Sequence, residues 1–162
     1  MKIFIGADHA GFEMKQALLP FLRELGHEVV DKGAFEFNAD DDYPDFIIPV
    51  AREVAKDPEV VRGVVIGGSG QGEAMAANRF KGVRAAVYYG FPIPRSDVES
   101  GSRSDLSIIK LSRQHNNSNI LSLGARFLNE NDAKEALRLW LLTPFAEENR
   151  HHRRLKELDE IQ

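Results

Sequence analysis

Four glycines stand directly before a carboxylate, Glu73, in the segment VVIGGSGQGEAMAANR at residues 64–79. Glycines let the backbone turn sharply, and free N–H groups at the start of the helix that follows can bind an anion or a developing oxyanion. The simpler interpretation is a tight turn without a ligand, in which Glu73 only complements the helix dipole. The segment therefore predicts an anion site with an acidic side chain beside it.

Three familiar motifs nearly match this segment, and each fails. A nucleotide-binding P-loop needs Lys and then Ser or Thr where Glu73 and Ala74 stand. A dinucleotide-binding loop needs a third glycine at Glu73 and an acid near Tyr88. A serine-hydrolase elbow needs a glycine two residues after Ser69, where Gln71 stands. Nucleotides, nicotinamide cofactors and a serine nucleophile are therefore disfavoured.

Other polar side chains lie close to predicted strands. Asp8 and His9 follow the first strand, and Arg126 follows the last one. Ligands of open α/β sheets bind at the carboxyl ends of the strands, although Asp8 could equally act as a helix N-cap. His115 precedes the last strand, and with His9 it would put two imidazoles and an acid on rim loops. Either histidine alone is equally well explained as a surface residue.

The C-terminal segment RHHRR, residues 150–154, adds two arginines on a predicted helix. Arg150 and Arg154 are four residues apart and therefore share one face of that helix. Such a pair can bind a phosphate through bidentate hydrogen bonds. The alternative is a solvated basic face, neutralised by the glutamates nearby.

The elements that must position these residues alternate along the chain. Short apolar runs predict strands at residues 2–5, 28–30, 64–66, 83–87 and 120–123. Helices are predicted at residues 12–25 and 46–56, from residue 72 or 73, at 132–142 after an Asp132 capping box, and at about 144–162. Pro20 and Pro49 should kink or break the first two helices. This alternation predicts an α/β fold, a three-layer αβα sandwich with a five-stranded, mostly parallel, Rossmann-like sheet.

The composition narrows the class of protein. A chain of 162 residues with 43% hydrophobic content predicts a single domain with a real core. The absence of cysteine excludes disulfides, zinc–thiolate sites and thiol catalysis. No apolar run is long enough to span a bilayer, no secretory signal is evident, and a net charge of −4 disfavours general nucleic-acid binding. We expect a soluble, cytoplasmic protein.

Two segments interrupt the regular alternation. Asp40, Asp41 and Asp42 lack the spacing of a calcium-binding loop and predict a solvated turn. Residues 90–105, GFPIPRSDVESGSRSD, predict a long loop, and loops of this length in compact domains are functional or disordered.

Five ordered blocks together resemble the ribose-5-phosphate isomerase B family. They are GADHAGFEMK at 6–15, DKGAF at 31–35, GGSGQGEAMAANRFKGVRAA at 67–86, LSRQHNNSNILSLGAR at 111–126 and RHHRR at 150–154. The resemblance covers nearly the whole chain, except that residues 90–105 look like an insertion. It implies an enzyme that interconverts an aldose phosphate and its ketose through an enediol, without a metal or a cofactor.

The resemblance also implies roles for individual residues. Catalytic roles fall to Glu73 as base, His115 in opening the sugar ring and Ser69 as a proton shuttle. Substrate contacts fall to Asp8, His9, Gly68, Ser69, Gly70, Gln71, Gly72, Asn116, Arg126, Arg150 and Arg154. One branch of the family uses a cysteine as base at the position of Gly67, so this chain is expected to belong to the glutamate branch.

The resemblance further implies a homodimer, or a tetramer, whose site is shared between subunits, with the C-terminal arginines coming from the neighbour. Ribose 5-phosphate is the expected substrate. A hexose 6-phosphate, a tetrose phosphate or a non-catalytic sugar-phosphate-binding role are the alternatives. One conflict stands at Glu73, because a helix N-terminus lowers the pKa of a carboxyl whereas a general base needs it raised.

Overall fold

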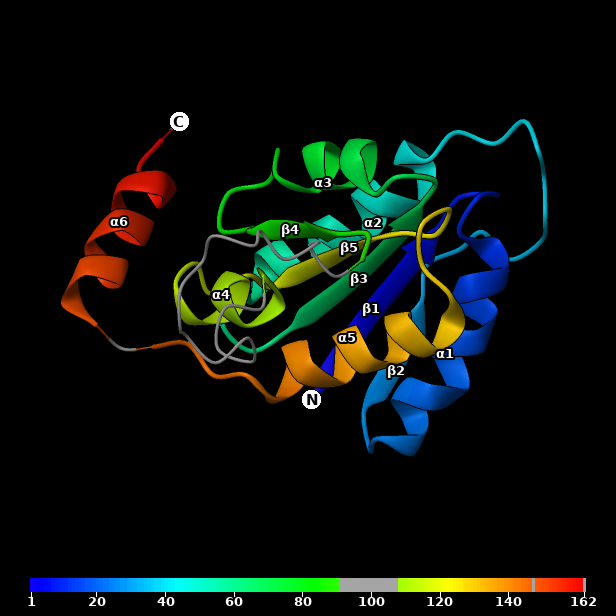
Figure 1. Cartoon of the computed structure of the whole chain (residues 1–162). Coiled ribbons are helices and arrows are strands. Elements are labelled where there is room, and N and C mark those ends of the chain that lie inside the picture. Colours follow the sequence, from blue (N-terminus) through cyan, green and yellow to red (C-terminus); the bar gives the residue numbers. More distant parts are fainter. Residues whose placement is uncertain (91–107, 147, 162) are drawn as a thin grey trace, which may run out of the picture.

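A parallel five-stranded sheet organises the chain, in the order β2-β1-β3-β5-β4. The computed structural model describes residues 1–90, 108–146 and 148–161. The strands are β1 (Lys2–Ala7), β2 (Glu28–Asp31), β3 (Arg62–Gly67), β4 (Ala85–Tyr88) and β5 (Ile120–Gly124). They alternate with helices along the chain, as the apolar runs predicted (Figure 1).

Helices cover both faces of the sheet. They are α1 (Phe12–Glu24), α2 (Pro44–Lys56), α3 (Gln71–Ala77), α4 (Ile108–Gln114), α5 (Glu130–Leu142) and α6 (Asn149–Asp159). One apolar core joins the sheet to α1, α4 and α5, and a second joins its other face to α2 and α3. The predicted three-layer αβα sandwich is therefore confirmed. None of the helices in the described ranges is long and apolar enough to cross a membrane.

The predicted element boundaries need three corrections. Pro20 and Pro49 lie inside continuous helices, so neither proline ends its helix. The fifth helix begins at Glu130, because Asn129 is its N-cap and accepts a hydrogen bond from the backbone N–H of Asp132 at 2.9 Å. Asn caps helices as well as Asp does, so the sequence offered two equivalent starts. The last helix begins at Asn149, not at about 144.

The parallel sheet has two functionally distinct edges. The carboxyl edge is where the strands end and where α1 and α3 begin. The amino edge is where the strands begin, and it carries the loops that lead into them. In Figure 1 the arrowheads of β1, β3 and β5 point to the same end of the molecule, and α6 lies beyond α4 at the opposite end. Side chains near the two edges are separated by the length of a strand.

Candidate active site

The glycine-rich loop runs from the end of β3 into α3 and carries Glu73 over its own first residue. Gly70 is the N-cap of α3 and has a left-handed backbone, with a φ of +77° that favours glycine. Glu73 is only 4% exposed. A Cβ placed on Gly67 would overlap the carboxylate of Glu73, so the absence of a side chain at Gly67 provides the space that this carboxylate fills.

The pKa of Glu73 is raised above its usual value. Burial is the largest cause, because removal of water disfavours the charged carboxylate. Backbone hydrogen bonds at Glu73 itself and at Gly70 lower the pKa, and the nearby negative charge of Asp8 raises it. The start of α3 therefore acts as the sequence predicted, but burial outweighs it. This resolves the conflict between the helix terminus and a basic carboxylate.

The turn after β1 brings Asp8 to the same place. Asp8 is 7% exposed, and its Oδ1 accepts hydrogen bonds from the backbone N–H groups of Ala10 and Gly11, at 3.0 and 3.1 Å. A Cβ on Gly11 would overlap the carbonyl of Ile66, so the turn packs tightly against the end of β3. Asp8 thus caps the turn that leads into α1 and also faces the glycine-rich loop.

His9 is held by Asp41, which corrects the prediction of a solvated acidic turn. Asp41 Oδ1 accepts the backbone N–H of His9 at 3.0 Å and lies 2.6 Å from His9 Nδ1. The Asp41 side chain is 7% exposed, whereas Asp40 and Asp42 are exposed. In a run of three identical residues, the type of residue cannot indicate which one turns inward. Mainly through this hydrogen bond, Asp41 raises the pKa of His9.

The tip of the glycine-rich loop is polar and accessible. Ser69 and Gln71 are exposed, and the Ser69 hydroxyl accepts the backbone N–H of Gln71 at 3.3 Å. Behind the tip, the buried Ser122 donates to the Gly70 carbonyl at 2.6 Å. The loop is therefore anchored at its base and presents its outer face to solvent.

Arg126 and Tyr43 border the loop. The backbone N–H of Arg126 donates to the Gly68 carbonyl at 3.1 Å, and a Cβ on Gly68 would lie 3.2 Å from the Arg126 guanidinium carbon. The ring of Tyr43 packs against Gly72, where an added Cβ would lie 3.1 Å from the Tyr43 Cζ atom. Sequence reasoning missed Tyr43 and Asp41. The available indication was Pro44, since proline at the first position of a helix marks where a loop at the carboxyl edge ends.

The remaining predicted site residues lie at the amino edge of the sheet. They are His115, Asn116, Arg150 and Arg154. Gly63 pairs with Ile120 at that edge, and Gly67 pairs with Gly124 at the other. Four residues of strand, at about 3.3 Å each, separate the edges by roughly 13 Å. The expectation that His115 shares a rim with His9 is therefore wrong within one chain.

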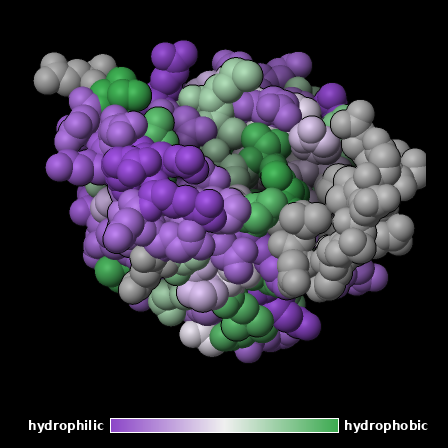
Figure 2. Space-filling view, turned by 60° about the vertical axis from the view of Figure 1, so that its left-hand side comes forward, coloured by the Kyte–Doolittle hydropathy of each residue, from purple (hydrophilic) through white to green (hydrophobic). Residues whose placement is uncertain are grey.

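Each residue of this second group has its own environment. The His115 ring stacks on that of His151, with 4.5 Å between the centroids and 12° between the planes. Arg150 and Arg154 are exposed on α6, and Arg150 Nε lies 2.7 Å from a carboxylate oxygen of Glu148. Asn116 is exposed and lines a cavity of about 830 Å³ between β4 and α6, together with the apolar Leu155. Figure 2 shows a hydrophobic hollow beside the strongly hydrophilic C-terminal surface.

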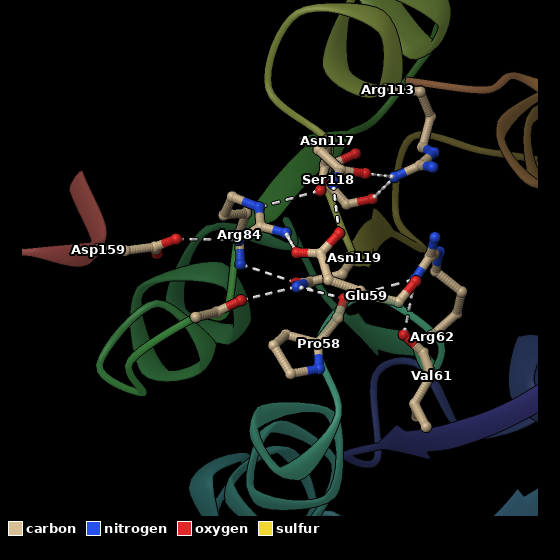
Figure 3. Close-up of polar contacts among 11 residues, drawn as sticks. Pro58, Glu59, Val61, Arg62, Arg84, Arg113, Asn117, Ser118, Asn119 and Asp159 are labelled. Atoms are coloured by element: carbon tan, nitrogen blue, oxygen red, sulfur yellow. Dashed lines mark hydrogen bonds and ion pairs between the residues drawn. The ribbon is translucent and has the colours of Figure 1, made fainter. Parts of the chain in front are cut away.

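The loop that carries His115 and Asn116 is fixed by a polar network at the amino edge (Figure 3). Asn117 adopts a φ of +44°, and its side chain accepts from Arg113 and donates to Glu59, both at 2.8 Å. The fully buried Asn119 accepts the backbone N–H of Arg84 at 2.8 Å. The Asn119 amide also donates to the Gly82 carbonyl at 2.7 Å and the Pro58 carbonyl at 3.2 Å.

Glu59 is bonded to Arg84 and Arg62 directly, and to Arg113 through the side chain of Asn117. Arg84 Nη2 lies 2.9 Å from Glu59 Oε1, and its Nη1 lies 3.6 Å from an oxygen of Asp159 on α6. Burial, followed by the charges of Arg62 and Arg84, lowers the pKa of Arg113 to about 10. The network thus joins the start of β4 to the loop before β5, and one ion pair extends it to Asp159 of α6.

Asp8, His9 and Asp41 form a cluster whose geometry could also hold a metal ion. One potential ligand atom from each lies within 4.8 Å of the others. However, the Oδ1 atoms of Asp8 and Asp41 already accept two hydrogen bonds each, counting the His9 ring. These hydrogen bonds account for the way the three side chains converge, and we assign the cluster to hydrogen bonding.

Comparison with known proteins identifies the family. The model of the ribose/galactose isomerase family matches residues 3–91 and 96–158. The chain belongs to this family. Within the predicted insertion at residues 90–105, the match omits only residues 92–95. Most of that segment lies outside the described residues, so its role stays a prediction.

Individual members resemble the chain over its whole length. Ribose-5-phosphate isomerase B of Mycolicibacterium paratuberculosis is 37% identical over 162 residues, which are 100% of this chain and 92% of the relative. The enzyme of that name from Escherichia coli is 36% identical, covering 99% of this chain and 96% of the relative.

Solved structures agree. That of ribose-5-phosphate isomerase B from Mycoplasma genitalium, with bound ribulose 5-phosphate, matches with a TM-score of 0.84 and 35% identity, over 98% of this chain and 93% of that one. That of the Clostridium thermocellum enzyme matches with a TM-score of 0.82 and 38% identity, over 99% of this chain and 96% of that one. The resemblance carried by the five sequence blocks is thereby confirmed, as is the class of aldose–ketose isomerases.

Proposed function

We propose that this chain interconverts ribose 5-phosphate and ribulose 5-phosphate through an enediol, with Glu73 as the base. The observation that carries the proposal is the buried carboxylate of Glu73, which lies over Gly67 at the start of α3 with a raised pKa. A carboxyl whose pKa moves toward neutrality is a better general base and a better acid in the return step. The names of the relatives support the substrate.

In the proposed reaction, Glu73 removes the proton from C2 of the open-chain aldose. The electron pair of the C2–H bond forms the C1–C2 double bond, and the aldehyde oxygen becomes an oxyanion. Backbone N–H groups of the loop stabilise that oxyanion, at typically 3–4 kcal/mol for each donor. Glu73 then returns the proton to C1, while Ser69, exposed at the loop tip, carries a proton between the two sugar oxygens.

The site is completed by a second copy of the chain. His115, Asn116, Arg150 and Arg154 lie at the amino edge, and Glu73 lies at the carboxyl edge. A two-fold dimer would unite the two groups of residues. In such a dimer the carboxyl edge of each subunit faces the amino edge of its partner. Two such sites per dimer follow, and two dimers could form a tetramer.

The phosphate of the substrate is assigned to the arginines. Arg126 borders the glycine-rich loop, and Arg150 and Arg154 of the second copy provide exposed guanidinium groups four residues apart. Guanidinium groups bind phosphate oxygens in pairs, which fixes the orientation of the sugar. Asp8 and His9 complete the contacts of this half. A cytoplasmic location is part of the proposal and is supported by the lack of cysteine.

The test is the variant Glu73→Gln. It should bind the sugar phosphate but lose exchange of the C2 proton with deuterated solvent, followed by NMR, because an amide cannot accept that proton. Parental turnover in this variant would disprove the assignment of the base.

The family description names galactose as well as ribose, which favours hexose 6-phosphates as the second candidate substrate class. Purified protein tested against pentose, hexose and tetrose phosphates, with a ketose readout, separates the candidates. A protein that binds these compounds and converts none of them would be the non-catalytic alternative.

A further inference from the structure

His9 is bonded twice to one buried carboxylate, that of Asp41. Among the described residues, no other imidazole of the proposed site is held in this way. The Oδ1 atom of Asp41 accepts the backbone N–H of His9 and contacts its ring nitrogen Nδ1 at 2.6 Å. The first bond fixes where the residue stands, and the second fixes the orientation of the ring. Asp41 comes from the loop before α2, 32 residues further along the chain.

The arrangement leaves the other ring nitrogen available. The described part of the chain offers His9 Nε2 no hydrogen-bond partner, and the side chain is 31% exposed. Asp41 is shielded at 7% exposure, and its Oδ2 atom is buried without a hydrogen-bond partner among the described residues. The carboxylate therefore faces inward and directs the imidazole outward.

The charges around the ring favour its protonated form. Asp41 and Asp8 raise the pKa of His9, with the Asp41 hydrogen bond as the largest cause, while burial and the charge of Arg126 lower it. The guanidinium of Arg126 itself lies against Gly68 of the glycine-rich loop. His9 follows β1 and Arg126 follows β5, the two strands that flank β3, so a protonated His9 and Arg126 would put two cationic groups at the carboxyl edge of the sheet.

We propose that Asp41 is a positioning residue, which binds Nδ1–H of His9 so that Nε2–H of the imidazolium donates to the phosphate of the sugar. This deepens the proposed function and rests on it for the identity of the substrate. A phosphate beside Arg126 needs donors, and an imidazolium has an N–H on each nitrogen. Without Asp41, His9 would be free to rotate and would lose its proton at lower pH.

The experiment measures binding of inorganic phosphate by calorimetry at roughly pH 6 and pH 8, on either side of the ordinary histidine range. Phosphate affinity should fall as the pH rises through the raised pKa of His9. Asp41→Asn should weaken phosphate binding about 10-fold, as expected for a lost charge-assisted hydrogen bond, and should move that fall to lower pH. The ionisation of phosphate itself affects parent and variant alike.

Asp40→Asn and Asp42→Asn are the matched controls, because each removes the same charge from an exposed neighbour. They should bind phosphate like the parent, and an equal weakening in all three variants would reduce the effect to general electrostatics and overturn the proposal. In the reaction, Asp41→Asn should raise KM far more than it lowers kcat. A loss confined to kcat would overturn the role in phosphate binding.

A measurement on the unaltered protein guards against misfolding of the variant. The ¹H–¹⁵N spectrum of the imidazoles should show His9 protonated at Nδ1 and titrating above its ordinary 6.5, with His9→Gln providing the assignment. Titration at or below that value would overturn the proposal. None of these binding measurements needs turnover, so failure of Glu73 as the base would be seen separately.

Discussion

At the scale of the residue, Glu73 shows how burial sets the function of a carboxylate. Two backbone hydrogen bonds at the start of α3 lower its pKa, yet burial and the charge of Asp8 give a net rise. The same carboxylate in an exposed first turn would simply complement the helix dipole. Water exclusion therefore makes the difference between a helix-stabilising residue and a base.

This balance has a cost in stability that depends on pH. The pKa of Glu73 is above its ordinary 4.5 in the folded chain, so folding favours the protonated form. The stability that protonated Glu73 contributes to the folded chain is fully present below pH 4.5. It is lost as the pH rises through the raised pKa of the folded state. Glu73→Gln is neutral at every pH, and we expect it to unfold at a higher temperature than the parent at neutral pH.

The measurement is a pair of thermal unfolding curves at neutral and at acidic pH. The advantage of the variant should shrink or vanish below pH 4.5, where Glu73 of the parent is protonated as well. Gln71→Glu is a suitable control, because it changes an exposed position on the same helix. A Glu73→Gln variant less stable than the parent at neutral pH would contradict the claim that the buried, charged carboxylate destabilises the fold.

At the scale of the element, apolar runs and helical spacing predicted all five strands and most of the helices to within a few residues. The errors come where two local solutions are equivalent, as at Asn129 and Asp132. They also come where tertiary contacts decide, as at Asp41. The position of His115 was available from the sequence, since a residue that precedes a parallel strand lies at the amino edge. The stacking of His115 on His151 was not available, because it depends on how α6 folds back.

Asn119, directly before β5, is a polar residue of the interior. Its side chain satisfies the backbone N–H of Arg84 and the carbonyls of Pro58 and Gly82. We expect Asn119→Ala to destabilise the fold by about 2–4 kcal/mol, because buried backbone groups lose their partners. Urea unfolding followed by circular dichroism measures this.

The matched control is Asn131→Ala on the exposed side of α5, which should change stability by less than about 0.5 kcal/mol. Equal effects of the two substitutions would show that the asparagine network at the amino edge contributes no stability.

At the scale of the whole molecule, the proposed site is divided between opposite edges of the sheet. Glu73, Asp8, His9 and Arg126 belong to one edge, and the residues around His115 to the other. The cavity and the exposed arginines at the amino edge are suited to contact with a second copy. A monomer would then hold two incomplete halves and no complete site.

This division predicts complementation between inactive variants. Glu73→Gln damages only one half, and the double variant Arg150→Ala, Arg154→Ala damages only the other. In mixed dimers of the two, one of the two sites has both halves intact. An equal mixture, unfolded and refolded together, should recover about a quarter of parental activity if subunits pair at random.

Each variant refolded alone should stay inactive, and size-exclusion chromatography should show that both dimerise. Inactivity of the mixed dimers would disprove a site shared between subunits.

The carboxylate that lies over Gly67 also constrains how such an enzyme can evolve. The space beside the loop accommodates one functional side chain. It is filled either by the glutamate of α3 or by a side chain at position 67. A lineage that exchanges one for the other must pass through an overfilled site or through an empty one. We therefore expect the two solutions to be inherited as alternatives, with few viable ancestors between them.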